Sequence, residues 1–240
     1  MVADAGAQGA PRLGRSGIAR VATVLFGIVL QATIFFVAAG STEIARAWIY
    51  YGTLLAYFLI AMPVLFVRFP QILEVVNERG KYKAETKTWD KVWGIAYAVL
   101  LLVIPFVAGR DVGHGAADLS AVLLVPSLLV TIAAYALAQW AMVVNPYAET
   151  GARVQADRGQ HVVDTGPYRY VRHPFYVSIV LMQLVYPTAI GSILAFGPVA
   201  VLVVIVVWRT AMEDRMLHAE LAGYAAYAAR TRYRLLPGVW

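Results

Sequence analysis

The chain has 240 residues, of which 60% are hydrophobic and 14% are charged, and its mean hydropathy is +0.66. Soluble domains carry about 25% charged residues, so this composition excludes an ordinary soluble protein and favours a protein embedded in lipid. No cysteine is present, which excludes disulfides, thiolate nucleophiles and cysteine-ligated metals.

Five uncharged segments follow one another along the chain, and each reaches the roughly 18 residues that span about 30 Å of hydrocarbon. They are residues 21–42, 47–67, 92–109, 119–148 and 174–208. The first segment follows three arginines, as the core of a signal peptide would. Because its 22 residues exceed a usual signal-peptide core, we predict a retained first helix.

The last segment is 35 residues long, which as one helix would measure about 52 Å, too long for a bilayer. Pro187, Gly191 and the pair Gly197-Pro198 interrupt it, so we predict a helical hairpin that turns near residues 187–192. Its short first arm either crosses the bilayer or only dips into it, and both ends of the hairpin face the same side in either case.

The fold class that follows is all-α: a polytopic integral membrane protein with about six transmembrane helices, including the C-terminal hairpin. The expected organisation is a disordered cytoplasmic tail over residues 1–16, four transmembrane helices over 17–143, and a cofactor-binding segment, hairpin and tail over 144–240. The expected helices cover residues 18–40, 47–68, 91–108, 119–143, 174–187 and 193–212.

Positive charge is unevenly distributed between the connecting segments. Of the 20 Lys and Arg residues, 18 fall in the N-terminal tail, the second and fourth loops and the C-terminal tail, and the exceptions are Arg46 and Arg110. The positive-inside rule therefore predicts that both termini are cytoplasmic. A basic rim beside anionic lipid explains the net charge of +6, so no nucleic-acid partner is expected.

The stretch TGPYRYVRHPFY, residues 165–176, lies at the cytoplasmic mouth of the hairpin. Gly166-Pro167 predicts a turn, and His173-Pro174 predicts the start of a helix, where backbone N–H groups favour an anion. Taken alone, Arg169 and Tyr170 fit an ordinary interfacial belt.

A second polar cluster ends the final helix, where Arg209 and Glu213 are four residues apart on one helical face. Alone, these two would be an ordinary surface pair. The hairpin, however, brings them to the same membrane side as His173, and together the clusters predict a polar pocket with donors, a carboxylate and aromatic walls.

These residues carry a resemblance to a known family. The segments HVVDTGPYRYVRHPFY, RTAMEDRML, GYAAY and YRLLPG, together with NPYAETGARVQADRGQHVV, are similar to the isoprenylcysteine carboxyl methyltransferase family of integral membrane methyltransferases. The wider group includes phospholipid N-methyltransferases. The similarity covers about residues 139–240, and the earlier part resembles only generic membrane helices.

The resemblance implies that S-adenosylmethionine binds in a cytoplasmic pocket and leaves as S-adenosylhomocysteine. It implies that Glu213 binds a cationic or hydroxyl-bearing part of the cofactor, that Arg209 orients or polarises the acceptor, and that Asn145 is a further candidate for the acceptor side. It implies that the remaining cofactor contacts come from Gln155, Gln160, His161, Val162, Val163, Tyr168, His173, Pro174, Phe175 and Tyr176.

Three departures from the family pattern concern Ser178, Asp214 and Ala222, where a glycine, a glutamate and an aromatic residue are common. We expect the helix-start N–H groups around His173 to bind the methionine carboxylate of the cofactor. We expect no metal, because His161 and His218 have no third ligand at a suitable spacing. The charged stretch 77–91 is expected to be a solvated cytoplasmic loop, with a part that is helical along the membrane surface.

The sequence therefore predicts a methyltransferase that acts on a lipophilic or membrane-partitioned acceptor at the cytoplasmic face of the inner membrane. A carboxyl oxygen is the nearest acceptor by analogy, while a phospholipid amine or a thiol stays open. The rival from another class is a small-solute transporter, which the lack of ionisable residues within the spans disfavours. A membrane reductase that binds a nicotinamide cofactor and has a similar C-terminal half is the remaining enzyme alternative. The sequence leaves the oligomeric state open.

Overall fold

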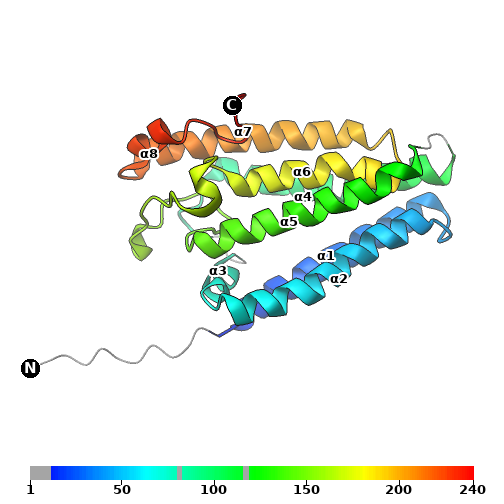
Figure 1. Ribbon diagram of the computed structural model, residues 1–240, viewed down its shortest axis with the longest axis horizontal. Coiled ribbons are helices and arrows are strands. Elements are labelled where there is room, and N and C mark those ends of the chain that lie inside the picture. Colours follow the sequence, from blue (N-terminus) through cyan, green and yellow to red (C-terminus); the bar gives the residue numbers. More distant parts are fainter. Residues whose placement is uncertain (1–11, 80–82, 116–118) are drawn as a thin grey trace, which may run out of the picture.

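The computed structural model describes residues 12–79, 83–115 and 119–240, so most of the predicted tail 1–16 lies outside the described residues. Within these ranges the chain is all-helical, as predicted (Figure 1). The helices are α1 Arg15–Ala39, α2 Ala45–Arg68, α3 Ile72–Glu78, α4 Thr88–Gly113, α5 Leu124–Val144, α6 Pro174–Ile190, α7 Phe196–Glu220 and α8 Tyr224–Arg230, with short 3-10 turns η1 Ala121–Leu123, η2 Ala156–Arg158 and η3 Gly166–Arg169.

Five of these helices are long and apolar enough to cross a membrane, namely α1, α2, α4, α5 together with η1, and α7. The protein is therefore a polytopic membrane protein. The sixth predicted span corresponds to α6, whose 17 residues make it about 26 Å long, slightly less than the thickness of the hydrocarbon core.

The predicted hairpin is present, with α6 and α7 joined by a short turn. Gly191 ends α6 at φ +94°, and its N–H donates to the carbonyl of Pro187 at 2.8 Å. A Cβ on Gly191 would lie 2.9 Å from the guanidinium of Arg46, which itself donates to the carbonyls of Thr188 and Ala189. Gly197-Pro198, by contrast, lies within the first turn of α7 and does not break it, since proline is tolerated there.

Two glycines in α4 allow it to pack closely against α1. A Cβ on Gly109 would overlap the carbonyl oxygen of Phe35, and one on Gly113 would overlap that of Ala39. Small residues four positions apart let two membrane helices approach at backbone distance. The pair therefore fixes how α1 and α4 sit together.

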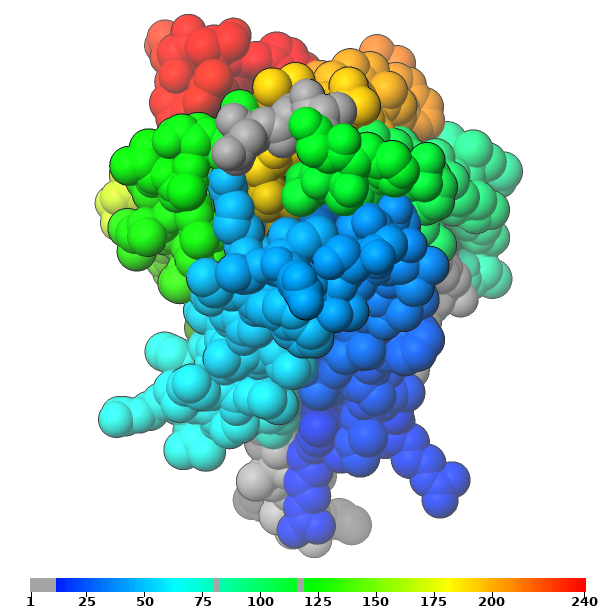
Figure 2. Space-filling view, turned by 90° about the vertical axis from the view of Figure 1, so that its right-hand side faces the viewer, coloured from blue at the N-terminus to red at the C-terminus, as the bar shows by residue number. Residues whose placement is uncertain are grey.

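The buried core runs along the bundle between the N-terminal and C-terminal helices. It contains apolar side chains from α1, α2, α4, α6 and α7 and a buried hydrogen bond of 2.8 Å between the hydroxyls of Tyr51 and Tyr186. Figure 2 shows α1 and α2 (blue) on one side, the C-terminal helices (orange and red) on the other, and α5 (green) between them.

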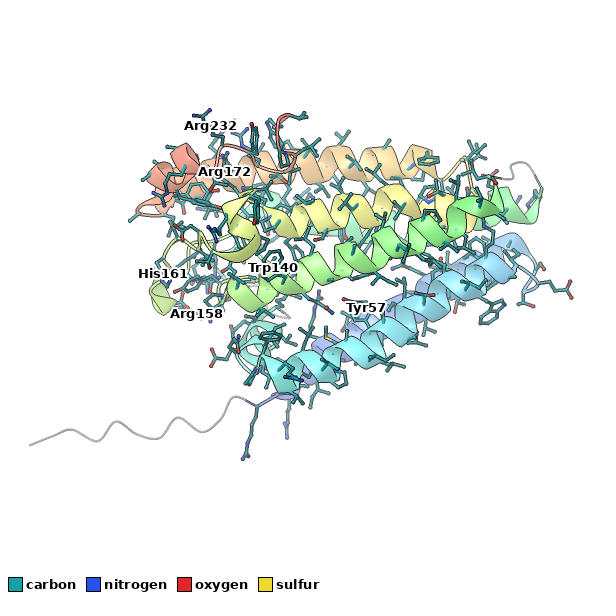
Figure 3. The ribbon with its side chains drawn as sticks, viewed as in Figure 1. Tyr57, Trp140, Arg158, His161, Arg172 and Arg232 are labelled. Carbon is teal, nitrogen blue, oxygen red and sulfur yellow. The ribbon has the colours of Figure 1, made fainter. Side chains whose placement is uncertain are left out.

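Polar structure gathers at one end of the bundle. Helices α3 and α8 and the long connection between α5 and α6 all lie at that end in Figure 1. Arg158, His161 and Arg172 lie there, whereas Tyr57 lies farther along the helices (Figure 3). A site built from the 145–176 segment must therefore form at this end.

Candidate functional site

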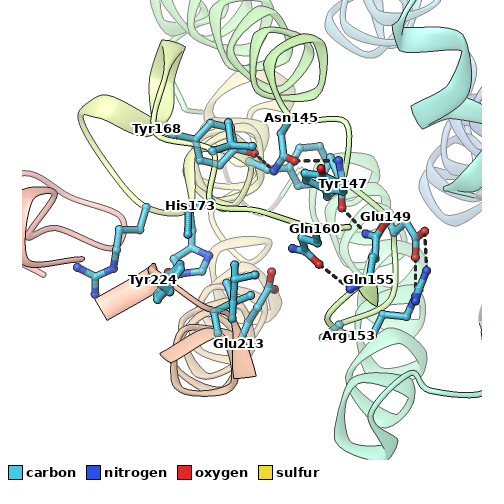
Figure 4. Close-up of a pocket in the computed structure, with 18 of the residues that line it drawn as sticks. Asn145, Tyr147, Glu149, Arg153, Gln155, Gln160, Tyr168, His173, Glu213 and Tyr224 are labelled. Carbon is cyan, nitrogen blue, oxygen red and sulfur yellow. Dashed lines mark hydrogen bonds and ion pairs between the residues drawn. The ribbon is translucent and has the colours of Figure 1, made fainter. Parts of the chain in front are cut away.

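A pocket of about 120 Å³ opens at the polar end of the bundle (Figure 4). Its walls come from the residue after α3, the connection between α5 and α6, the start of α6, the second half of α7, and α8.

All the site residues predicted from the sequence line this one pocket, although they are spread over 69 positions of the chain. Their assigned roles remain predictions, but the structure does bring them together. They are Asn145, Gln155, Gln160, His161, Val162, Val163, Tyr168, His173, Pro174, Phe175, Tyr176, Arg209 and Glu213.

The predicted Gly-Pro turn places Tyr168 in the pocket wall. Gly166 has φ +57°, and a Cβ there would lie 2.8 Å from the side chain of Val144. The buried Tyr168 hydroxyl accepts a hydrogen bond from the Asn145 amide at 3.0 Å, and its carbonyl accepts one from Tyr227 at 2.8 Å. Burial raises the pKa of Tyr168 to about 12, despite the opposing effect of Asn145, so the phenol is neutral.

His173 precedes α6, as predicted, and its ring stacks on Tyr176 with the two centroids 5.7 Å apart. The expectation that the N–H groups around His173 are available for an anion is wrong for two of them. The N–H groups of Arg172 and His173 donate to the carbonyls of Tyr233 and Arg234, at 2.9 and 3.0 Å. The C-terminal segment occupies these donors because it folds back against the start of α6.

Asp214 is the centre of a buried ionic cluster beside the pocket. It is 1% exposed and accepts from Arg172 Nε at 2.8 Å, Arg234 Nε at 2.7 Å and the Tyr224 hydroxyl at 2.9 Å. His173 Nε2 lies 3.2 Å away. Burial, followed by the Asp214 charge, raises the pKa of Tyr224, which keeps it a neutral donor. Sequence reasoning had noted Asp214 only as a departure from the family pattern.

Arg209 is held rigidly and is 3% exposed. Its Nε donates to Asp90 at 2.6 Å, one Nη to Glu213 at 3.1 Å and the other to the Thr150 carbonyl at 3.0 Å. Its guanidinium also lies 4.2 Å from the ring centroid of Trp93, a cation–π distance. The alternative of an ordinary surface pair is therefore wrong for Arg209.

The expectation of a solvated, partly helical loop over 77–91 is confirmed only in part. Glu85 is exposed and α4 begins within the stretch, but residues 80–82 lie outside the described residues and the carboxylate of Asp90 is buried. Asp90 is 0% exposed and, besides Arg209, accepts from the Ala152 N–H at 2.7 Å. Arg79 lines the pocket, and Thr86 is buried. An acidic residue in the first turn of a helix is common on electrostatic grounds, so no signal in the sequence marked Asp90 as a buried ion-pair partner.

The connection between α5 and α6 is braced by its own polar side chains. Gln155 is 2% exposed, and its amide donates to the Tyr147 carbonyl while its N–H donates to Gln160, both at 2.7 Å. Arg153 pairs with Glu149 at 3.0 Å. Tyr147, Glu149 and Arg153 also line the pocket (Figure 4). Sequence reasoning had included them only within the segment of resemblance.

Some polar residues do not join the pocket. Arg169 and Tyr170 are exposed and outside its lining, as an interfacial role requires.

The two histidines considered as metal ligands have other neighbours. His161 bonds to the Tyr147 hydroxyl at 2.8 Å, and His218 lies 3.9 Å from Asp214. Among the described residues, no group of three or more His, Asp or Glu side chains is placed to hold a metal ion.

The segment that carries the pocket also matches a known family. The model of the isoprenylcysteine carboxyl methyltransferase (ICMT) family matches residues 123–220. This segment includes every pocket residue predicted from the sequence. ICMT family membership implies a methyltransferase that uses S-adenosylmethionine on a lipophilic acceptor. No curated protein sequence matches the chain.

The side chains in the pocket suit this cofactor. A sulfonium and an ammonium group favour carboxylates and aromatic faces, and the pocket offers Glu149, Glu213 and Tyr176. An adenine ring favours an apolar slot, and Val162 and Leu217 line the same pocket.

Proposed function

We propose that the chain methylates a carboxyl oxygen on a prenylated, lipophilic acceptor at the cytoplasmic face of the inner membrane. The observation that carries this proposal is the charge of the pocket. Four arginines line it and three of them pair with carboxylates, so the guanidinium of Arg79 adds a positive charge that no carboxylate pairs with among the described residues. An excess positive charge attracts a carboxylate and disfavours a cationic phospholipid amine.

The cofactor is assigned to the side of the pocket nearer the connection between α5 and α6. Gln155 and the 160–163 segment line its site, Tyr168 and the 173–176 segment hold its adenosyl and methionine parts, and Glu213 pairs with a cationic or hydroxyl-bearing part. When bound, S-adenosylmethionine supplies an electrophilic methyl group on a sulfonium, which leaves as a neutral thioether.

Arg209 is assigned to the acceptor. Three of its five N–H groups are engaged by Asp90, Glu213 and Thr150, which fixes the plane of the guanidinium and leaves two donors for a carboxylate oxygen. An acceptor carboxylate is already deprotonated, so no general base is required. In-line displacement depends mainly on how the acceptor oxygen is positioned relative to the methyl group. A guanidinium held on three sides can fix that position. Asn145 is also assigned to the acceptor, and its hydrogen bond to the Tyr168 hydroxyl joins the acceptor side to the cofactor side.

The orientation rests on the charge asymmetry, with 18 of the 20 Lys and Arg residues in segments that would share one side. The connection between α5 and α6, which lines the pocket, lies at the same end of the bundle as α3 and α8 (Figure 1). A reporter fused after Trp240 should read cytoplasmic, and one inserted near Gly113 should read external. An external C-terminus would rule out the proposed site, because S-adenosylmethionine is made in the cytoplasm.

The enzymatic proposal is tested with purified protein in detergent, radiolabelled S-adenosylmethionine and N-acetyl-S-farnesylcysteine. We expect base-labile label in the lipophilic product, since a methyl ester hydrolyses in base and an N-methyl group does not. A total lipid extract is offered as an acceptor in a parallel assay. Label that appears only in this extract and resists base would favour the phospholipid amine.

Cofactor binding is tested separately with S-adenosylhomocysteine. Glu213→Gln and His173→Ala should each weaken its binding about ten- to a hundredfold, the loss of about one charge-assisted contact. NADPH should not bind. Wild-type affinity in both variants, with folding intact, would remove Glu213 and His173 from the cofactor site.

A further inference from the structure

The arginines that line the pocket differ in how their charge is balanced. Arg153 pairs with Glu149, Arg172 with Asp214, and Arg209 with two carboxylates. Arg79 also lines the pocket, but within the described ranges it makes no ion pair with a carboxylate. Its guanidinium donates instead to the carbonyl of Ala148 at 2.8 Å.

Arg79 and Arg209 are held by neighbouring groups. Arg79 lies 4.4 Å from the ring centroid of Phe175, and Arg209 lies 4.9 Å from that of Tyr176. Arg79 donates to the carbonyl of Ala148, while Arg209 donates to that of Thr150, two residues later. Both guanidiniums are therefore held by the same two segments, and the charge of Arg209 acts on Arg79.

Burial makes the charged form of Arg79 less favourable than it would be in water. Burial, together with the charges of Arg20 and Arg209, lowers the pKa of Arg79 to about 9. The residue still carries its proton at neutral pH, so an unbalanced cation faces the pocket. A partly desolvated cation of this kind is stabilised when an anion binds beside it.

We propose that Arg79 is a second acceptor-binding residue, which holds the carboxylate of the acceptor together with Arg209. This inference rests on the proposed function and deepens it. The other possible anion is the methionine carboxylate of the cofactor. The acceptor is favoured because Arg209, which is assigned to the acceptor, is one of the charges that act on Arg79. Arg20 of α1 and Tyr97 of α4 also act on it, so Arg79 lies between the connection after α5 and the membrane-spanning helices.

The test compares a charged with a neutral lipophilic ligand. Binding of N-acetyl-S-farnesylcysteine and of its carboxamide is measured in detergent with S-adenosylhomocysteine present, for wild type, Arg79→Gln and Arg79→Lys. Arg68→Gln is the matched control, because Arg68 is an exposed arginine at the end of α2 and does not line the pocket. Affinity for S-adenosylhomocysteine and the thermal unfolding midpoint are measured for each protein.

We expect wild type and the Arg68 variant to prefer the carboxylate over the carboxamide by at least about tenfold, the effect of a charge-assisted hydrogen bond. Arg79→Gln should reduce this preference to about threefold or less, with S-adenosylhomocysteine affinity within about twofold of wild type. Arg79→Lys keeps the charge without the planar donor fork, so it should retain an intermediate preference, and it replaces the Gln variant if that variant does not fold.

Three results would overturn the proposal. The first is no carboxylate preference in wild type, and the second is a full preference in folded Arg79 variants. The third is a loss of S-adenosylhomocysteine affinity with the preference intact, which would assign Arg79 to the cofactor carboxylate. Methyl transfer to the probe is scored separately. A carboxylate preference without transfer would contradict the proposed reaction while leaving the anion site in place.

Discussion

The two parts of this bundle on either side of residue 123 contribute to the pocket in different ways. The C-terminal part carries the ICMT-family segment, the long connection after α5 and the ionic cluster around Asp214. The N-terminal part consists of apolar spans, yet it supplies Asp90 and Arg79. The comparison shows that the family segment is completed by side chains from helices that carry no family signature.

The contacts between the two parts are polar at both ends of the bundle. At the pocket end, Asp90 binds Arg209 and the N–H of Ala152. At the other end, Arg46 donates to carbonyls at the end of α6, and Asp111 accepts from the Ser192 hydroxyl at 2.7 Å. Apolar packing alone would let the helices slide, whereas these directional bonds fix the register in which they meet.

The largest expected effect lies wholly within the C-terminal part. Asp214→Ala would leave Arg172, which is buried, without its carboxylate, and breaking a buried pair costs about 3–5 kcal/mol. We expect a large fall in the unfolding free energy, measured by denaturation in detergent. The control is Asp164→Ala, whose exposed pair with Arg230 should contribute little. Equal stability in both variants would contradict a structural role for the Asp214 cluster.

The next effect tests the contact across the two parts. Asp90→Asn keeps the shape of the side chain but removes the negative charge to which Arg209 and the Ala152 N–H donate. A hydrogen bond to a charged group contributes about 1.5–3 kcal/mol, so the rate of methyl transfer should fall about ten- to a hundredfold, with a smaller change in S-adenosylhomocysteine affinity. In a double-mutant cycle with Arg209→Lys, the double variant should lose less of the methyl-transfer rate than the sum of the two single losses in activation free energy. Additive losses would mean that Asp90 acts independently of Arg209.

A smaller effect separates acceptor from cofactor. Arg209→Lys keeps the charge, but an ammonium group cannot reach Asp90, Glu213 and the Thr150 carbonyl in the geometry of a planar fork. We expect nearly normal S-adenosylhomocysteine binding and a turnover at least about tenfold lower, since errors of orientation reduce the rate. Single-turnover methylation measures this. A parallel fall in affinity would place Arg209 in the cofactor site.

The smallest effect concerns a bridge between the two parts at the surface. Lys87 and Glu220 pair at 2.7 Å, but their side chains are 35% and 42% exposed. Exposed pairs contribute about 0.2–1 kcal/mol, so Lys87→Ala should shift the unfolding midpoint slightly, and less at high salt. A large, salt-independent loss of stability would contradict this expectation. It would show that Lys87, and not only Asp90, contributes strongly to the contact between the two parts.

The sequence by itself determined the all-α class, the hairpin and the residues of the C-terminal pocket wall. Hydrophobic segments of bilayer length leave few alternatives to a helix, because backbone groups in lipid must bond within their own segment. The turn at Gly191 followed from local chemistry, and so did the helix start at Pro174. Turns and helix starts of this kind depend on neighbours within a few residues.

Tertiary structure alone decided which charges are buried and which partners they meet. Asp90 stands 119 positions from Arg209, and a carboxylate in the first turn of a helix looks the same in sequence whether it faces solvent or a guanidinium. Nothing in the sequence indicated that the N–H groups of Arg172 and His173 bond to the C-terminal segment, which lies about 60 positions later. Such choices depend on the packing of distant helices, because burial makes an ion pair favourable only where both partners lose water together.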